Sequence, residues 1–212
     1  MNILVPITSP LDDENISIKL ETKDNERLYH LINSKYGTKI VISVYPEPKN
    51  MIGGEGSIFK TNFYYPCTDG VCDEFCSADT KNIPVKLFLQ KFYATSNQAK
   101  EKPPRGYARK LLCAFIERLQ QENGLADDAI IILEASGEVQ GSTTGLVKMY
   151  QRMGFKIVAL EEYGEPVYSG DTDEERRQRC TGEFNDVVEE EFMTTAMATR
   201  LADLISYCST LK

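Results

Sequence analysis

The stretch EKPPRGYARKLL, residues 101–112, decides how we interpret this chain. Two prolines precede Arg105 and Gly106, and apolar residues at helical spacing follow. This pattern predicts a helix that runs to Asn123 and is capped by Gly124. The first amides of a helix lack intrahelical partners and lie at its positive dipole end, so they form a natural phosphate-binding site. The alternative is an ordinary helix start with a packing glycine.

Predicted strands and helices alternate along the rest of the chain, which indicates an α/β (α+β) protein. The predicted strands are 15–22, 38–45, 85–95, 129–136 and 155–160, and a strand running into a helix is predicted within 188–210. The other predicted helices are 23–37 and 142–153. The run 129–136 is almost continuously apolar, as expected for a strand that is covered on both faces.

Composition indicates one globular domain, residues 1–212, with a Cys-rich insertion near 51–82 and an acidic insertion near 161–191. The chain is 42% hydrophobic, which is enough for a sizeable core. No apolar run approaches the roughly 18 residues of a membrane span, and no signal peptide is apparent. We therefore expect a cytoplasmic protein whose six cysteines are mostly thiols.

The net charge of −8 is concentrated in the acidic insertion, where twelve acidic residues and three arginines give a local net charge of −9. The chain has no basic patch of the kind that binds nucleic acid. An acidic segment can attract a cationic ligand, although such segments are more often only solvated loops.

The Cys-rich insertion raises the question of a metal site. Its cysteines are Cys67, Cys72 and Cys76. His30 or Cys180 could complete a zinc site with them, but the spacing contains no second tight pair. We expect loop thiols and no metal. His30, the single histidine, lies within the predicted helix 23–37, where a packed or surface role is expected.

The order of these elements resembles the GCN5-related N-acetyltransferase (GNAT) family. The acetyl-CoA signature of that family, Gln/Arg-x-x-Gly-x-Gly/Ala, opens the helix after the fourth strand, and Gly106 and Ala108 match it. Pro103 stands where the family has Gln or Arg, so no side-chain role is carried over to that position. The resemblance covers residues 85–160, with a closing strand and helix within 188–210.

A second signature of the family is a helix with a tyrosine four residues before Gly-Phe, and Tyr150, Gly154 and Phe155 match it. The resemblance implies a mixed, mostly antiparallel sheet, splayed between its fourth and fifth strands and flanked by helices. The pantetheine arm of acetyl-CoA would lie between the strands 85–95 and 129–136. The diphosphate would lie on the helix start formed by Arg105, Gly106, Tyr107, Ala108, Arg109 and Lys110.

Acetyl transfer to an amine needs a base, a donor for the developing oxyanion, and an acid for the leaving thiolate. Tyr150 resembles the tyrosine that family members place near the thioester sulfur, so we expect it to be the acid. The alternative is a core tyrosine on a helix stripe with Leu146 and Met153. Glu134, at the end of an apolar strand, is the expected base or the residue that orders a base water. The alternative for Glu134 is a structural or substrate-binding carboxylate.

We therefore expect an N-acetyltransferase that moves an acetyl group from acetyl-CoA to a primary amine by direct attack in a ternary complex. A polyamine or another small cationic amine fits the acidity best. The open alternatives are a protein lysine or N-terminal acetyltransferase, a non-catalytic acyl-CoA-binding domain, and an interaction module built on the Cys-rich insertion. No nucleic-acid or membrane partner is expected. Dimers are common in the family, so a homodimer stays open.

Overall fold

The computed structural model describes residues 9–50, 84–96, 99–135, 143–161 and 194–211. The strands are β1 (Ile16–Lys23), β2 (Glu26–Asn33), β3 (Thr38–Asn50), β4 (Pro84–Tyr93), β5 (Ile130–Ala135), β6 (Lys156–Glu161) and β7 (Thr194–Arg200). The helices are the short 3₁₀ turn η1 (Pro10–Asp12), α1 (Tyr107–Asn123), α2 (Thr143–Arg152) and α4 (Leu201–Ser209).

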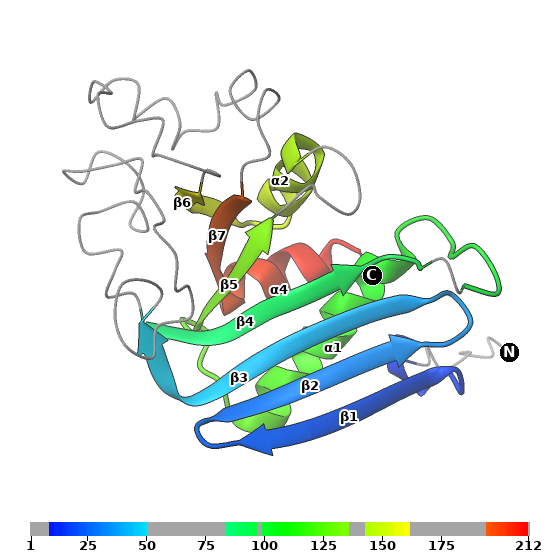
Figure 1. Cartoon of the computed structure of the whole chain (residues 1–212), viewed down its shortest axis with the longest axis horizontal. Coiled ribbons are helices and arrows are strands. Elements are labelled where there is room, and N and C mark those ends of the chain that lie inside the picture. Colours follow the sequence, from blue (N-terminus) through cyan, green and yellow to red (C-terminus); the bar gives the residue numbers. More distant parts are fainter. Residues whose placement is uncertain (1–8, 51–83, 97–98, 136–142, 162–193, 212) are drawn as a thin grey trace, which may run out of the picture.

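The strands form one mixed sheet in the order β1-β2-β3-β4-β5-β7-β6 (Figure 1). Neighbouring strands are antiparallel except for β4 and β5, which run parallel. The prediction of a mixed, mostly antiparallel sheet flanked by helices is thus confirmed. None of the described helices has the length and apolar composition needed to span a membrane.

The prediction of a helix over 23–37 is wrong. A two-residue turn that starts at Asp24, whose φ is +47°, joins β1 directly to β2. Asp and Asn tolerate this left-handed conformation and favour such hairpin turns. Tyr29, Leu31 and Asn33 are buried on alternate positions of β2, so the apolar residues follow a period of two. The Asp-Asn turn signal outweighs the helical spacing of the leucines.

The second predicted strand, 38–45, is longer than expected. β3 continues past Pro46 and Pro48, but its pairing with β4 jumps from Val44 to Lys49. The two prolines therefore lie in the stretch that makes no ladder pairs, as expected for residues that cannot donate a backbone hydrogen bond.

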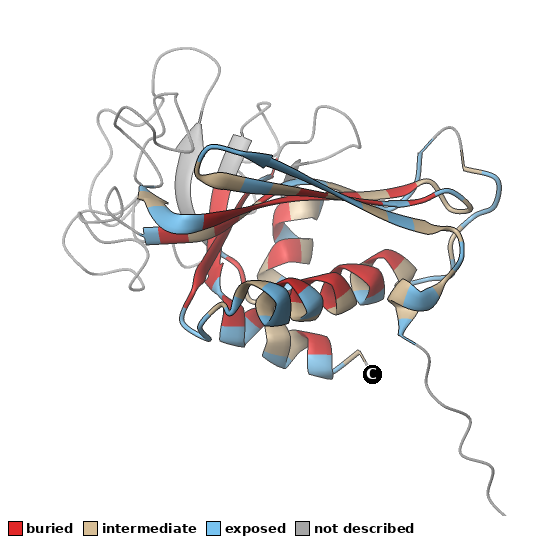
Figure 2. Cartoon of the chain, turned by 90° about the horizontal axis from the view of Figure 1, so that it is seen from below, coloured by how far each residue is buried: buried red, intermediate tan, exposed pale blue. Residues whose placement is uncertain are grey.

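The helices α1 and α4 pack on one face of the sheet, and their buried residues point toward it (Figure 2). We call this side the helix face; Leu31, Ile42 and Leu89 lie on it. The apolar stripe of α1 is buried as predicted: Ala108, Leu111, Leu112, Cys113, Phe115, Ile116 and Leu119. Gly124 ends the helix with φ +60°, and its N–H donates to the Gln120 carbonyl.

The last described elements also follow the sequence pattern. α2 begins at Thr143, and Ser142 lies outside the described residues. Gly154 follows α2 with φ +91°, a conformation that favours glycine. The predicted closing strand and helix are β7 and α4, and β7 lies between β5 and β6 in the sheet. The predicted strand 155–160 is β6.

A disulfide joins Cys113 of α1 to Cys208 of α4, two buried residues 95 positions apart. This pair contradicts the expectation of thiols at these two positions. The sequence could not indicate the pairing, because it depends on α1 and α4 packing side by side on the helix face. The other four cysteines lie outside the described residues.

Candidate functional site

The start of α1 carries unused backbone donors. Gly106 is the N-cap residue, and no side chain caps the helix. Among the described residues, the amides of Gly106, Ala108 and Arg109 have no hydrogen-bond acceptor, whereas the Tyr107 N–H donates to the Pro104 carbonyl over 3.0 Å. Such free amides at the positive end of a 17-residue helix suit an anion.

Gly106 is required by its backbone conformation. Its φ is +80°, and an added Cβ would lie 3.8 Å from Arg109 Nη2, which is ordinary contact. The sequence interpretation stressed close approach of a ligand to a residue without a Cβ. The structure adds the left-handed conformation as a second and sufficient reason for glycine.

The side chains of the predicted cofactor segment divide into two groups. Arg109 Nη1 donates to the Tyr207 hydroxyl over 3.1 Å, and the Tyr107 hydroxyl accepts from Asn33 Nδ2 over 2.7 Å. Burial raises the pKa of the Tyr107 hydroxyl. Arg105 and Lys110 are exposed and make no ion pair within the described ranges. These two side chains are therefore the cations that remain available at the helix start.

The strands β4 and β5 separate at a defined point. Their parallel pairing ends at Leu89 and Leu133, although β4 continues to Tyr93. Beyond this point β4 pairs with β3 alone, and β5 turns away from it (Figure 1). We call this opening the fork. The pairing of β4 with β3 shifts register beside the fork, where Gln90 is the extra residue of a β-bulge.

Tyr150 of α2 lies at the fork on the helix face. Its ring centroid is 6.5 Å from that of Phe92, which follows the last β4–β5 pair, and 5.7 Å from that of Phe155. The residue is 6% exposed and belongs to the same core cluster as Leu89 and Leu133. Burial raises the pKa of its hydroxyl above the ordinary value of 10.0. The phenol is thus protonated at neutral pH.

Glu134 also lies at the fork, but on the other face. It follows Leu133, the last residue of β5 that pairs with β4, and its side chain is exposed. Since successive residues of a strand point to opposite faces, Glu134 points away from the core cluster that contains Leu133 and Tyr150. Tyr150 and Glu134 therefore do not meet directly. A molecule that passes through the fork could be reached from both faces, because no ladder closes the sheet there.

Sequence reasoning missed a polar network on the same face as Glu134. The Ser43 hydroxyl donates to Glu26 Oε1, and Gln90 Nε2 donates to Ser43 Oγ over 2.6 Å. Gln90 Nε2 also lies 3.4 Å from Glu26 Oε1. We call this side of the sheet the polar face. The three residues come from β2, β3 and β4, so only the strand register brings them together.

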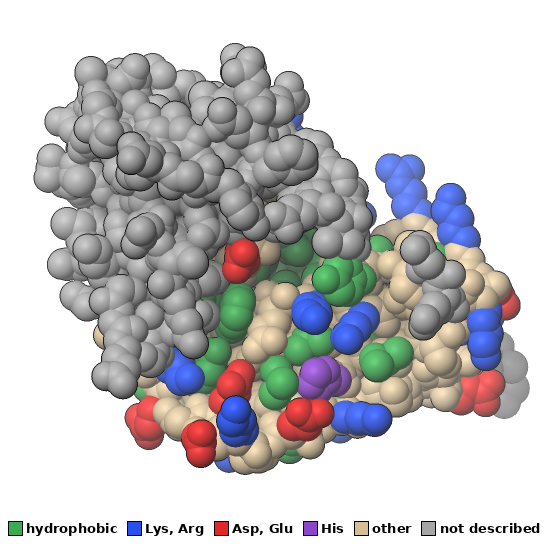
Figure 3. Space-filling model, viewed as in Figure 1, with side chains coloured by type: hydrophobic (Ala, Val, Ile, Leu, Met, Phe, Trp, Pro, Cys, Tyr) green, Lys and Arg blue, Asp and Glu red, His purple; other side chains and the backbone are tan. Residues whose placement is uncertain are grey.

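The polar face also carries His30, the single histidine, on β2 rather than on a helix. Figure 3 shows it among basic, acidic and apolar side chains. His30 Nε2 is buried without a hydrogen-bond partner and lies 3.8 Å from Glu21 Oε1. The described part of the chain contains no group of three side chains that could hold a metal ion. The candidate zinc ligands Cys67, Cys72, Cys76 and Cys180 lie outside it.

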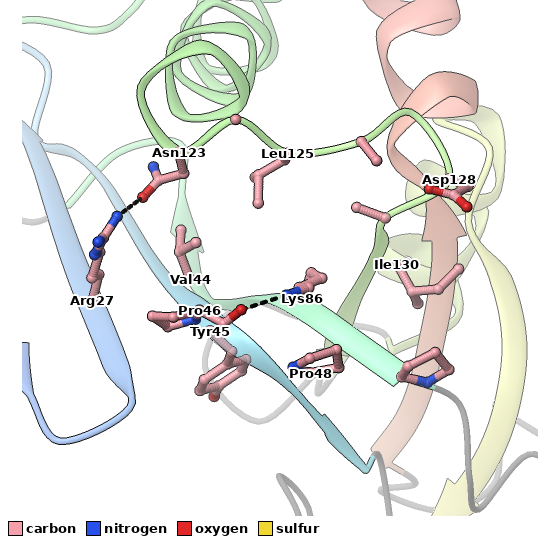
Figure 4. A pocket seen from close by; sticks show the side chains of 14 residues that line it. Arg27, Val44, Tyr45, Pro46, Pro48, Lys86, Asn123, Leu125, Asp128 and Ile130 are labelled. Carbon is pink, nitrogen blue, oxygen red and sulfur yellow. Dashed lines mark hydrogen bonds between the residues drawn. The ribbon is translucent and has the colours of Figure 1, made fainter.

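A separate pocket of about 540 Å³ lies at the opposite end of α1 (Figure 4). Val44, Leu125 and Ile130 contribute apolar walls, and Arg27 Nη1 donates to Asn123 Oδ1 across its rim over 2.8 Å. The 17 residues of α1 separate this pocket from the helix start by about 25 Å. It therefore does not coincide with the fork or with the predicted coenzyme segment.

Comparison with known proteins identifies no relative. No family model, curated protein or solved structure matches the chain.

Proposed function

We propose that the chain is an N-acetyltransferase of the GNAT type, which transfers the acetyl group of acetyl-CoA to a primary amine. The observation that carries the proposal is the fork between the parallel strands β4 and β5. It supports an acetyl-CoA site because β4 leaves amides after Leu89 that β5 does not use. The helix that follows β4 starts with free amides that suit the diphosphate.

In this proposal the pantetheine arm enters the fork and pairs with β4, as an added strand would. The diphosphate lies on the free amides of Gly106, Ala108 and Arg109, and Arg105 and Lys110 add positive charge. Arg109 and Tyr107 act mainly through their internal hydrogen bonds, which hold the start of α1 against α4 and β2. This segment therefore positions the coenzyme by its backbone more than by its side chains.

The proposed reaction is a direct attack of the neutral amine on the thioester carbon. The amine first loses a proton to Glu134, directly or through a water, because an alkylammonium has a pKa near 10. A C–N bond forms, the C–S bond breaks, and a backbone N–H of β4 stabilises the oxyanion. The nitrogen then loses its second proton to Glu134, which has passed the first one to the solvent. Tyr150 gives its proton to the departing thiolate and regains one from the solvent. The opposite placement of Glu134 and Tyr150 fits two proton transfers on two sides of one reacting centre.

A second candidate function is acyl-CoA binding without turnover. The deep burial of Tyr150 favours it, because a core tyrosine packed against Phe92 and Phe155 needs no catalytic role to explain it. Both candidates require the coenzyme site, and they differ only in the chemistry at the fork.

Two measurements test the proposal in sequence. Calorimetry with acetyl-CoA comes first, and we expect saturable binding. Acetyl-CoA consumption is then followed against polyamines, amino acids, aminoglycosides and peptides. Turnover on an amine supports the transferase, and binding without turnover supports the second candidate. The absence of acetyl-CoA binding would overturn both.

A further inference from the structure

We propose that Glu26 anchors the non-reacting ammonium group of a diamine or polyamine acceptor, an inference that rests on the proposed function. Glu26 would then determine which amines are used, while Glu134 serves the nitrogen that reacts. The inference depends on three properties of Glu26: its fixed geometry, its uncompensated charge and its place beside the fork.

The geometry of the Glu26 carboxylate is fixed by neutral groups. Its Oε1 accepts from the Ser43 hydroxyl and lies 3.4 Å from Gln90 Nε2. Ser43 is fully buried, so the side chain that holds Glu26 has little freedom to move. A carboxylate that is held in this way is already oriented when a ligand arrives, which lowers the entropic cost of binding.

The charge of Glu26 has no cationic partner among the described residues. Lys23 is its opposite residue in the β1–β2 register, but the two form no ion pair. The nearby Tyr45 hydroxyl adds no charge, because burial raises its pKa to about 12. A partly buried carboxylate that only neutral groups contact favours a cation, since a charge-assisted hydrogen bond would stabilise it further.

Gln90 links Glu26 to the fork. It is the first residue of β4 after the last β4–β5 pair, just as Glu134 is the first of β5. The side chain of Gln90 reaches Ser43 on the polar face, where Glu134 also points. Glu26 and Glu134 thus lie on one face, and the Gln90 side chain reaches from β4 toward Glu26 on β2.

Two carboxylates arranged in this way fit a molecule with two ammonium groups on a flexible apolar chain. The nitrogen at the fork must lose its proton to attack the thioester, whereas the distant nitrogen can stay charged and bound to Glu26. A monoamine whose nitrogen reacts at the fork has no second ammonium group to bind Glu26. Binding energy from this remote contact would position the reacting nitrogen, as remote contacts do in other enzymes.

The test compares 1,4-diaminobutane with butylamine, which has the same carbon chain and one ammonium group fewer. The wild-type protein should prefer the diamine in kcat/KM. Glu26→Gln keeps the hydrogen bond from Ser43 and removes the charge. We expect it to lower kcat/KM for the diamine about 10- to 100-fold through KM, and to reduce the preference over butylamine by the same factor.

Two further variants serve as controls for this result. Glu21→Gln removes a carboxylate from the same face that is 69% exposed and makes no hydrogen bond with Glu26, Ser43 or Gln90, and it should leave the preference unchanged. Glu26→Asp keeps the charge but moves it back by one methylene group, and should give an intermediate preference. This variant replaces Glu26→Gln if Glu26→Gln does not fold. A wild-type preference in Glu26→Gln, or an equal loss in Glu21→Gln, would overturn the anchor while turnover itself still supported the transferase.

The anchor can also be tested if the proposed function fails. Should the protein turn over neither amine, direct titration of the full chain with 1,4-diaminobutane, followed by NMR, replaces the kinetics. Weaker binding to Glu26→Gln than to the wild type or Glu21→Gln would support the anchor. No binding to the wild type, or equal binding to all three, would overturn it.

Discussion

The two halves of the sheet differ in how completely their strands are paired. From Ile16 with Asn33 to Lys23 with Glu26, β1 and β2 pair along their whole length. The pairing of β4 with β5 instead stops at Leu89 and Leu133. The ladder between β1 and β2 therefore leaves no gap along its length. The fork leaves strand amides and polar side chains that a ligand could use, so the proposed binding site and the fully paired strands occupy different parts of one sheet.

The strongest test of this division lies at the start of α1. Gly106→Glu adds bulk and negative charge where the diphosphate is proposed to lie, and should abolish acetyl-CoA binding. Gly124→Glu is the matched control, because Gly124 is also left-handed and sits at the other end of the same helix. It should carry similar strain and keep the wild-type affinity. Calorimetry on both folded variants checks the prediction, and retained affinity in Gly106→Glu would refute the placement.

The N-terminal half should respond in stability alone. Leu31 is completely buried between β2 and α1, so Leu31→Ala should lower the free energy of unfolding by about 2–5 kcal/mol. Leu31 lies on β2, which β3 separates from β4, so the folded variant should bind acetyl-CoA as the wild type does. Urea denaturation and calorimetry measure the two quantities. Loss of affinity in the folded variant would show that the two halves are coupled.

Tyr150→Phe should affect turnover rather than stability at neutral pH. The variant keeps the ring contacts with Phe92 and Phe155 and loses only the hydroxyl. We expect kcat to fall roughly 10- to 10³-fold with little change in acetyl-CoA affinity, since a thiolate leaves readily even without an acid. Turnover at the wild-type rate, under conditions where chemistry limits it, would make Tyr150 a core residue only.

The raised pKa of Tyr150 gives this variant a second signature. The folded protein favours the neutral phenol, so the associated stability is present below the unfolded value near 10 and is lost as the pH rises past it. Tyr150→Phe has no proton to lose, and its melting temperature should fall less steeply above pH 10. An equal decline of the melting temperature in both proteins would contradict the raised pKa of Tyr150.

The smallest predicted effect concerns charge steering by the acidic insertion near 161–191. Added salt should lower kcat/KM for a cationic acceptor several-fold, because the screening length shortens from about 10 Å at 0.1 M to about 3 Å at 1 M. Hydroxylamine, which is uncharged at neutral pH, is the control acceptor. Equal salt dependence of kcat/KM for both acceptors would show that the acidic insertion does not steer the cationic acceptor.

Local signals predicted much of this fold. The Pro-Pro-Arg-Gly start, the apolar stripe and Gly124 define α1 within the sequence itself, and the structure confirms its extent. The hairpin between β1 and β2 was missed because a stretch with Leu28, Leu31 and Ile32 satisfies a helical period and a strand period at once. The turn at Asp24 distinguishes the two, and it was visible in the sequence.

The candidate site was only partly within reach of the sequence. Tyr150 was found through a resemblance and Glu134 through its place at the end of an apolar strand, and the structure puts both at the fork. The network of Glu26, Ser43 and Gln90 could not be found, because these residues are far apart in the chain and meet only through the β2–β3–β4 register. The β-bulge at Gln90 is also a tertiary feature without a sequence signal of its own.

The disulfide between Cys113 and Cys208 has a mechanical consequence. The elements β5, α2, β6 and β7 all lie between these two residues, so one arm of the fork is inside a covalent ring that spans 95 positions. Force applied to the chain ends would bypass that ring and pass through the sulfur atoms. Reduction would release about 300 Å of hidden contour length, at up to roughly 3.3 Å per residue. Pulled from its ends, the oxidised protein would keep β5 inside the closed ring while β1, β2 and β3 peeled away first.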